Sequence, residues 1–190
     1  MPLPAVVLVE CCRLRHKLMA GLFGLVWEEE MKGIEQWLDE YGVSHRNPLN
    51  KRIHWVCVPL IVFSLIGLLW SIPHVYFADI LPGGAAPFLN WGTLFLALAS
   101  VYYLMLSRTL FVGMLGVCAV VAWGNFLLST LAVPLWAISG SIFVLAWIGQ
   151  FIGHEIEGKK PSFLQDIQFL MIGPAWCMSF LYGKLGIKLR

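Results

Sequence analysis

Residues 45–72 read HRNPLNKRIHWVCVPLIVFSLIGLLWSI, and this stretch decides the fold. Its second part, residues 53–72, is long enough to cross the roughly 30 Å hydrocarbon core of a bilayer as a helix. It contains no lysine, arginine, aspartate or glutamate. Three cations, Arg46, Lys51 and Arg52, precede it, which is typical of the cytoplasmic end of a membrane span. The stretch therefore predicts an integral membrane protein whose first span starts at the cytoplasmic face.

The remaining sequence predicts three more spans. The chain of 190 residues is 59% hydrophobic and 13% charged, against roughly 45–50% and about 25% in soluble domains. Apolar runs at residues 89–106, 109–128 and 131–152 have spanning length. We expect Pro134 in the first turn of the last run, where a missing N–H costs little. Short turns between successive runs favour antiparallel neighbours, so the predicted fold class is an all-α membrane bundle of four transmembrane helices.

The segments that flank these spans are expected to behave differently. Residues 1–30 resemble the first two regions of a signal peptide but lack a cleavage site, so we predict a poorly structured leader. Residues 31–190 are then a single helical membrane domain. In residues 28–41 the apolar positions form one helical stripe, and this N-terminal amphipathic helix lies either in the interface or against the core. Residues 167–182 are apolar but contain a Gly-Pro pair, which predicts a C-terminal interfacial or broken helix.

The distribution of lysine and arginine predicts the orientation of the bundle. Arg108 lies between the second and third spans, and Lys159 and Lys160 follow the fourth. The loop at 73–87 and the turn at 129–130 carry no lysine or arginine. By the positive-inside rule both termini are cytoplasmic, and an even number of spans agrees. The membrane is then either a bacterial inner membrane or the endoplasmic reticulum.

Three histidines meet at one face under this topology. His54 falls in the first turn of the first span, His154 just beyond the fourth span, and His45 nine residues before His54. His74 emerges on the opposite side and His16 lies in the leader. Three neutral imidazoles with open positions suit Fe(II), with zinc as second choice, whereas few carboxylates argue against magnesium or calcium. The alternative is that these histidines are amphipathic residues at the membrane boundary.

Polar residues surround the three histidines. Glu157 follows His154 by three residues and shares its face if the helix continues there, whereas Glu155 is a weaker candidate. Gln150, one turn before His154, serves either as a hydrogen-bond partner of that ligand or in helix packing. Six further donors anchor the cytoplasmic ends of the spans and can also hold an acidic headgroup: Arg46, Asn47, Asn50, Lys51, Lys159 and Lys160.

Two motifs in this region resemble those of a known family. The pattern HRNPxNxxxHxxxxP starts at His45, and QFIGHxxEGKKP starts at Gln150. Together they are similar to the two signatures of a membrane family long catalogued as a domain of unknown function. A characterised yeast member of that family is a 2-hydroxy fatty acid (2-hydroxypalmitate) dioxygenase of the endoplasmic reticulum. The resemblance covers roughly residues 31–190.

The resemblance implies iron(II)-dependent α-oxidation, in which a long-chain 2-hydroxy fatty acid and O2 yield a fatty acid one carbon shorter. It implies His45, His54 and His154 as Fe²⁺ ligands, with Glu157 as a fourth ligand or as an orienting residue. The acid group of the substrate is then held by four polar residues: Arg46, Asn47, Asn50 and Lys51. The substrate tail would lie in the lipid bilayer, and the active site would lie at the cytoplasmic face.

Other classes of function fit the sequence less well. A membrane di-iron hydroxylase needs many more histidines, and the serines of a membrane protease, Ser139 and Ser141, lie in mid-span, far from His154. No feature predicts binding to nucleic acid. The remaining alternative is a non-enzymatic scaffold or lipid-binding membrane protein.

Overall fold

The computed structural model describes residues 33–73, 87–160 and 168–189, and within them the regular structure is entirely helical. Contacts divide the chain between Gly33 and Ile34, and all helices described here belong to the second unit. They are α2 (Ile34–Val43), α3 (Pro48–Trp70), α4 (Trp91–Leu106), α5 (Arg108–Ser129), α6 (Leu135–Glu157) and α7 (Gln168–Lys184). The all-α fold is thus confirmed for these residues. The predicted leader, and the start of the amphipathic helix at 28–32, lie outside them.

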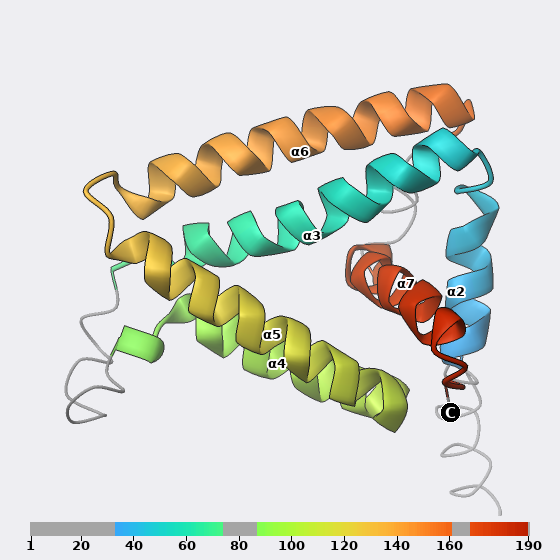
Figure 1. Cartoon of the computed structure of the whole chain (residues 1–190), viewed down its shortest axis with the longest axis horizontal. Helices are drawn as coiled ribbons and strands as arrows, with labels where there is room; N and C mark the ends of the chain where they lie inside the picture. Colours follow the sequence, from blue (N-terminus) through green and yellow to red (C-terminus); the bar gives the residue numbers. More distant parts are fainter. Residues whose placement is uncertain (1–32, 74–86, 161–167, 190) are drawn as a thin grey trace, which may run out of the picture. The chain divides into compact units, whose positions relative to one another are not determined.

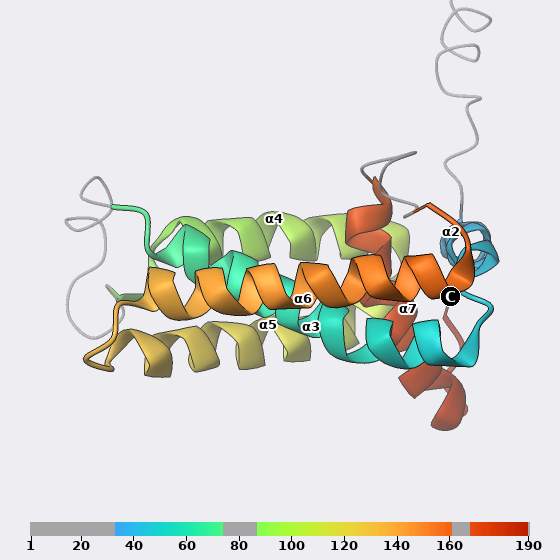
Figure 2. The same cartoon turned by 90° about the horizontal axis from the view of Figure 1, so that it is seen from above.

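The four long helices α3, α4, α5 and α6 alternate in direction, with α3 packed along α6 and α4 along α5 (Figure 1). The two pairs lie close together at the end where α3 stops and α6 begins. They separate toward the other end, where α2 and α7 run crosswise to them (Figures 1 and 2). The start of α3 and the end of α6 therefore lie side by side, as the antiparallel topology predicted.

The apolar helices are consistent with an integral membrane protein. α3, α5 and α6 are long and apolar enough to cross a membrane, whereas α4 has 16 residues and is about 24 Å long. Large aliphatic side chains are exposed on the outer faces of all these helices, among them Val56, Leu98, Met105, Val112, Val120 and Leu145. A hydrocarbon environment removes the free-energy cost that water would impose on such surfaces.

The first helix of the bundle begins earlier than predicted. The Asn47 side chain accepts a hydrogen bond from Leu49 N (2.9 Å) and caps the helix. Pro48 takes the first position, where its fixed φ favours a helix. α3 therefore starts five residues before the predicted boundary at 53, and Lys51 and Arg52 lie on the helix rather than before it.

The fourth helix of the bundle, α6, is shifted relative to the prediction in the opposite direction. Pro134 is its N-cap residue, so the prediction that this proline lies in the first turn is wrong. At the other end the helix continues through Gly153 to Glu157 and stops at Gly158, whose φ of 70° is readily adopted only by glycine. His154 consequently lies in the last helical turn rather than beyond the span.

The C-terminal helix α7 is continuous from Gln168 to Lys184 although it contains Pro174. The sequence predicted either an interfacial helix or a broken helix here, and the structure shows that the helix is not broken. Hydrogen bonds with α4 and α5 anchor α7 on both sides of the proline. The Tyr103 hydroxyl donates to Met171 O (2.8 Å), and the Tyr182 hydroxyl donates to Thr109 O (2.9 Å).

Two glycines allow α3 and α6 to approach closely. A Cβ atom on Gly149 would lie 2.6 Å from Cys57 Sγ, and one on Gly153 would lie 2.5 Å from Asn50 Oδ1. The four-residue spacing places both glycines on the same face of α6, and small residues at this spacing are typical of close helix pairs in membranes. The glycine pair therefore positions the ends of α3 and α6 that carry His54 and His154.

We expect Gly149→Ala to destabilise the protein by about 1–3 kcal/mol, because the added methyl group overlaps Cys57 and forces the helices apart. Gly140→Ala on the same helix is the matched control, since its Cβ meets nothing within 4 Å. Thermal unfolding in detergent measures both variants. Equal unfolding temperatures for Gly149→Ala and Gly140→Ala would contradict the close packing.

Candidate metal centre

Three histidines from three parts of the chain meet in the interior. His45 lies in the connection between α2 and α3, His54 in the second turn of α3, and His154 in the last turn of α6. They are 1%, 1% and 5% exposed. The Nε2 atom of His54 lies 2.9 Å from Nε2 of His45 and 3.2 Å from Nε2 of His154. The predicted convergence of these side chains is therefore present.

The hydrogen bonds of the other ring nitrogens fix the tautomers of two histidines. His45 Nδ1–H donates to Tyr41 O (2.6 Å), and His54 Nδ1–H donates to Asn50 O (3.0 Å). Since a carbonyl oxygen only accepts, each Nδ1 carries the proton and each Nε2 presents a lone pair. Two lone pairs that face each other at 2.9 Å repel unless a cation lies between them.

Protonation of an imidazole would relieve this repulsion, but it is unfavourable for His45 at neutral pH. Burial lowers the pKa of His45 to about 4, although the hydrogen bond to Tyr41 O opposes this shift. The imidazole is therefore neutral at pH 7 and its lone pair is available. A neutral histidine whose second nitrogen is bound to a backbone carbonyl is the usual form of a metal-bound histidine.

The nitrogen–nitrogen distances also fit one metal ion. Metal–imidazole bonds of roughly 2.0–2.1 Å place two ligands of the same ion roughly 3–4 Å apart. One ligand atom from each of the three histidines lies within 4.8 Å of the others. Among the described residues this is the group of side chains that can hold a metal ion, and imidazole ligands suit iron, zinc, copper or nickel.

Aromatic side chains enclose the histidine group. The Tyr41 ring stacks on His45 with centroids 4.1 Å apart, and the Trp176 ring lies 5.2 Å from it. His154 Nδ1 and Gln150 Nε2 have no hydrogen-bond partner among the described residues. The hydrogen bond predicted as one role for Gln150, to His154, is thus not formed, and Gln150 is free to interact with another group.

Glu157 is engaged by the backbone rather than directed at the histidines. Its Oε1 accepts from Arg46 N (2.8 Å), and its Oε2 accepts from Asn47 N (2.8 Å) and Asn50 Nδ2 (3.0 Å). These bonds join the end of α6 to the connection that carries His45. Glu157 is not part of the metal-binding group, so this geometry favours the orienting role among the two predicted for it.

The predicted substrate-binding residues fall into two sets. Arg46 and Lys51 line a surface cleft of about 530 Å³ beside His45. Asn47 and Asn50, in contrast, are engaged in the helix cap and the contact with Glu157. Lys159 donates to Val43 O (2.9 Å) and lines, with Lys160 and His154, a second surface depression.

Sequence analysis missed two contributors to this site. Tyr41 supplies both a carbonyl and a stacked ring to His45, and its spacing of four residues from that histidine was the available signal. Gly149 and Gly153 form a small-x-x-x-small pattern, and this spacing was the available signal for the close approach of α3 and α6.

Comparison with known proteins agrees with this geometry. The family model described as 2-hydroxy-palmitic acid dioxygenase Mpo1-like matches residues 31–185. This chain belongs to the Mpo1-like family. It is 25% identical over 164 residues to the 2-hydroxy-palmitic acid dioxygenase MPO1 of Saccharomyces cerevisiae, covering 85% of this chain and 87% of the yeast protein. No solved structure matches the chain. The resemblance predicted from the two motifs is confirmed, and all three histidines lie in the matched region.

We expect Glu157→Ala to weaken metal binding about 10- to 100-fold, as loss of groups that orient metal ligands typically does. Three donors lose their acceptor, and the connection carrying His45 is released from α6. Glu155→Ala, an exposed change two residues away, is the matched control. Metal content and the unfolding temperature of metal-free protein are measured together. An unchanged unfolding temperature with lost metal would instead indicate direct ligation by Glu157.

Proposed function

We propose that this chain is an iron(II)-dependent dioxygenase that converts a long-chain 2-hydroxy fatty acid to the acid one carbon shorter. The observation that carries the proposal is the group of three buried imidazoles, two of which are fixed by backbone carbonyls with their Nε2 lone pairs facing each other. Membership of the Mpo1-like family supports the reaction class. The name of the yeast relative supports the substrate class.

Iron is preferred over zinc because of the chemistry of O2. A zinc ion has no redox chemistry, whereas Fe(II) held by a few protein side chains, histidines among them, with open positions is the form used in non-haem oxygenases. His45, His54 and His154 would hold the ion, which when bound supplies O2 activation and polarises the substrate oxygens. The rings of Tyr41 and Trp176 lie against His45 and exclude water from the faces of the imidazole that they cover.

The proposed reaction balances without an external reductant. RCH(OH)COOH and O2 give RCOOH, CO2 and H2O, so the bond between the first two carbons breaks and the second carbon becomes the new carboxyl group. One oxygen atom of the new carboxyl group comes from the substrate hydroxyl, and the other comes from O2. The enzyme therefore needs no electron-donating cofactor in addition to iron.

Two cations beside the histidines fit the acid group of such a substrate. Arg46 and Lys51 line the cleft next to His45, and hydrogen bonds from charged groups to a carboxylate are roughly twice as strong as neutral ones. We assign Asn47 and Asn50 an indirect part, because they hold the connection in place through the helix cap and Glu157.

We further propose that α3, α4, α5 and α6 all cross the membrane and that the histidines lie at the cytoplasmic face. Arg46, Lys51, Arg52, Arg108, Lys159 and Lys160 all occur near helix ends, and the antiparallel order brings those ends to one side. A fatty acid in the cytoplasmic leaflet would then present its carboxylate at the depth of the histidine group.

Anaerobic reconstitution of purified protein with Fe(II), followed by addition of O2 and 2-hydroxypalmitate, tests the reaction. We expect pentadecanoate and CO2 in equal amounts, and near-stoichiometric iron. His54→Ala should lose both iron and activity, since one of the three ligands is removed. Arg52→Ala, an exposed change two residues before His54 on the same helix, should retain both. Turnover by an iron-free preparation would refute the metal assignment, and no turnover by iron-loaded protein would favour the scaffold or lipid-binding alternative.

Labelling of single cysteines tests the proposed topology. Ala132→Cys lies in the turn between α5 and α6, and Lys160→Cys follows α6. In a background without the five native cysteines, an impermeant thiol reagent added to the non-cytoplasmic side should modify the first and not the second. Modification of both from one side would contradict the crossing of α6 and the placement of His154.

A further inference from the structure

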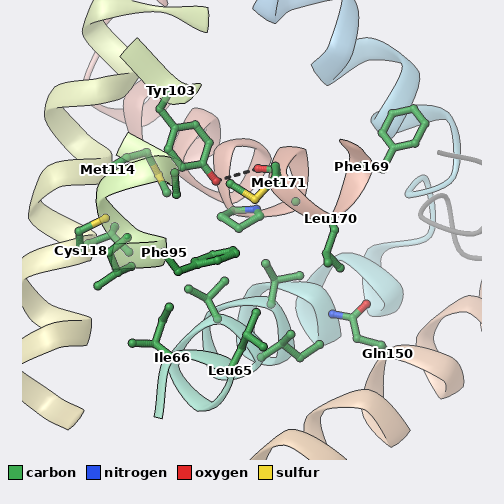
Figure 3. A pocket seen from close by; sticks show the side chains of 18 of the residues that line it. Leu65, Ile66, Phe95, Tyr103, Met114, Cys118, Gln150, Phe169, Leu170 and Met171 are labelled. Atoms are coloured by element: carbon green, nitrogen blue, oxygen red, sulfur yellow. Dashed lines mark hydrogen bonds between the residues drawn. The ribbon is translucent and has the colours of Figure 1, made fainter. Parts of the chain in front are cut away.

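An apolar cavity of about 170 Å³ lies among α3, α4, α5, α6 and α7. Leu65, Ile66, Phe95, Met114 and Leu170 are among the side chains that surround it, each contributed by a helix of the bundle or by α7 (Figure 3). Almost all of its wall is hydrocarbon, aromatic ring or sulfur. An aqueous or strongly polar ligand would lose its hydration there without compensation.

The cavity reaches the histidine group at one end. Tyr41 and His154 belong to its wall, and Gln150 lies one helical turn from His154. Gln150 is only 5% exposed, its Nε2 has no hydrogen-bond partner among the described residues, and its amide projects toward the apolar side chains (Figure 3). Because an unpaired buried donor is costly, this amide indicates a ligand that brings an acceptor into an otherwise apolar space.

The length of the cavity can be read along the helices that line it. On α3 the lining residues run from Val58 to Ile66, eight residues or about 12 Å, and on α6 they run from Phe143 to His154, eleven residues or about 16 Å. Carbon–carbon bonds of about 1.5 Å give a rise of about 1.25 Å per carbon in an extended alkyl chain. The lined space therefore matches an alkyl chain of about 10–13 carbons.

We propose that this cavity holds the acyl chain of the 2-hydroxy acid inside the bundle, with the 2-hydroxyl group accepting a hydrogen bond from Gln150. The carboxylate then lies on the side of His45 where Arg46 and Lys51 line the polar cleft, and the tail extends from His154 toward Ile66. This inference rests on the proposed dioxygenase function. If the acyl chain lies in this cavity, the length of the cavity, and not the thickness of the bilayer, determines which substrate chain lengths the enzyme accepts.

A bulky residue in the cavity should shorten the preferred substrate. Val117 lines the cavity on α5, whereas Val120 on the same helix is 72% exposed. We expect Val117→Phe to keep its iron and its turnover of 2-hydroxyoctanoate but to lose at least tenfold in kcat/KM for 2-hydroxypalmitate. Val120→Phe should keep the profile of the unmodified protein. If Val117→Phe does not fold, Val62→Phe on α3 applies the same test, with the 60% exposed Val56 as its control.

The outcomes separate this inference from the proposed function. Absence of turnover by the unmodified, iron-loaded protein with every 2-hydroxy acid overturns the function itself. Normal turnover with the same chain-length profile in folded Val117→Phe and Val120→Phe overturns only the cavity assignment.

A second readout does not require activity. A 2-hydroxy fatty acid with a terminal diazirine should crosslink near Ile66 and Phe95, and excess 2-hydroxypalmitate should prevent it. Crosslinking only at lipid-facing positions such as Val120 would place the tail in the bilayer. Crosslinking that excess phospholipid prevents and 2-hydroxypalmitate does not would identify a bilayer lipid as the occupant. Either result would overturn the proposal.

Gln150 is expected to act as a positioning residue. Gln150→Leu preserves the size of the side chain and removes the donor, so the KM for 2-hydroxypalmitate should rise about 3- to 10-fold, as for loss of one hydrogen bond. Binding of unsubstituted palmitate should not change, because it has no 2-hydroxyl group. Gln150→Asn should restore part of the difference. An equal loss of affinity for both acids would show a structural role and overturn this assignment.

Discussion

The close contact between α3 and α6 at Gly149 and Gly153 is the constraint on which the site depends. His54 and His154 are a hundred residues apart in sequence, and their side chains meet only because the backbones of the two helices approach without intervening Cβ atoms. In a membrane the hydrophobic effect adds little to helix association, so close packing of small residues carries more of the stability. The same contact therefore contributes to the fold and to the distance between two candidate metal ligands.

The third histidine is positioned by polar rather than steric means. His45 lies in a short connection, where the backbone alone would leave its ring free to rotate. Glu157 binds two successive backbone N–H groups of that connection, and Tyr41 fixes the ring through its carbonyl and its aromatic face. The bond from His45 to Tyr41 O is buried and the bond from Asn47 N to Glu157 is partly buried, so solvent weakens these two contacts less than it weakens surface pairs. These contacts hold the His45 ring toward the other two histidines, and ligands that are held in place lower the entropic cost of binding a metal ion.

Much of this arrangement could be predicted from the sequence because hydrophobic length and charge position are properties of single segments. The antiparallel helices and the meeting of His45, His54 and His154 follow from counting crossings. Contacts between segments were harder to predict. The role of Gly153 depends on which helix faces it, and the role of Glu157 depends on backbone donors that any residue type can supply. In the sequence around Gly153 and around Glu157, the spacing of residues is the only pattern that indicates these roles.

The surface cleft and the apolar cavity lie on two sides of the histidine group and differ in polarity. One side of the group opens to a cleft with Arg46 and Lys51, and the other side reaches an apolar cavity. An amphipathic acid has the same division between a charged end and a hydrocarbon tail. Transfer of that tail from one apolar environment to another costs little hydrophobic free energy, so the charged and hydroxyl groups determine the binding position. In the proposed complex the polar groups would hold the carbon to be oxidised at the histidines, and the depth of the cavity would limit the length of the tail.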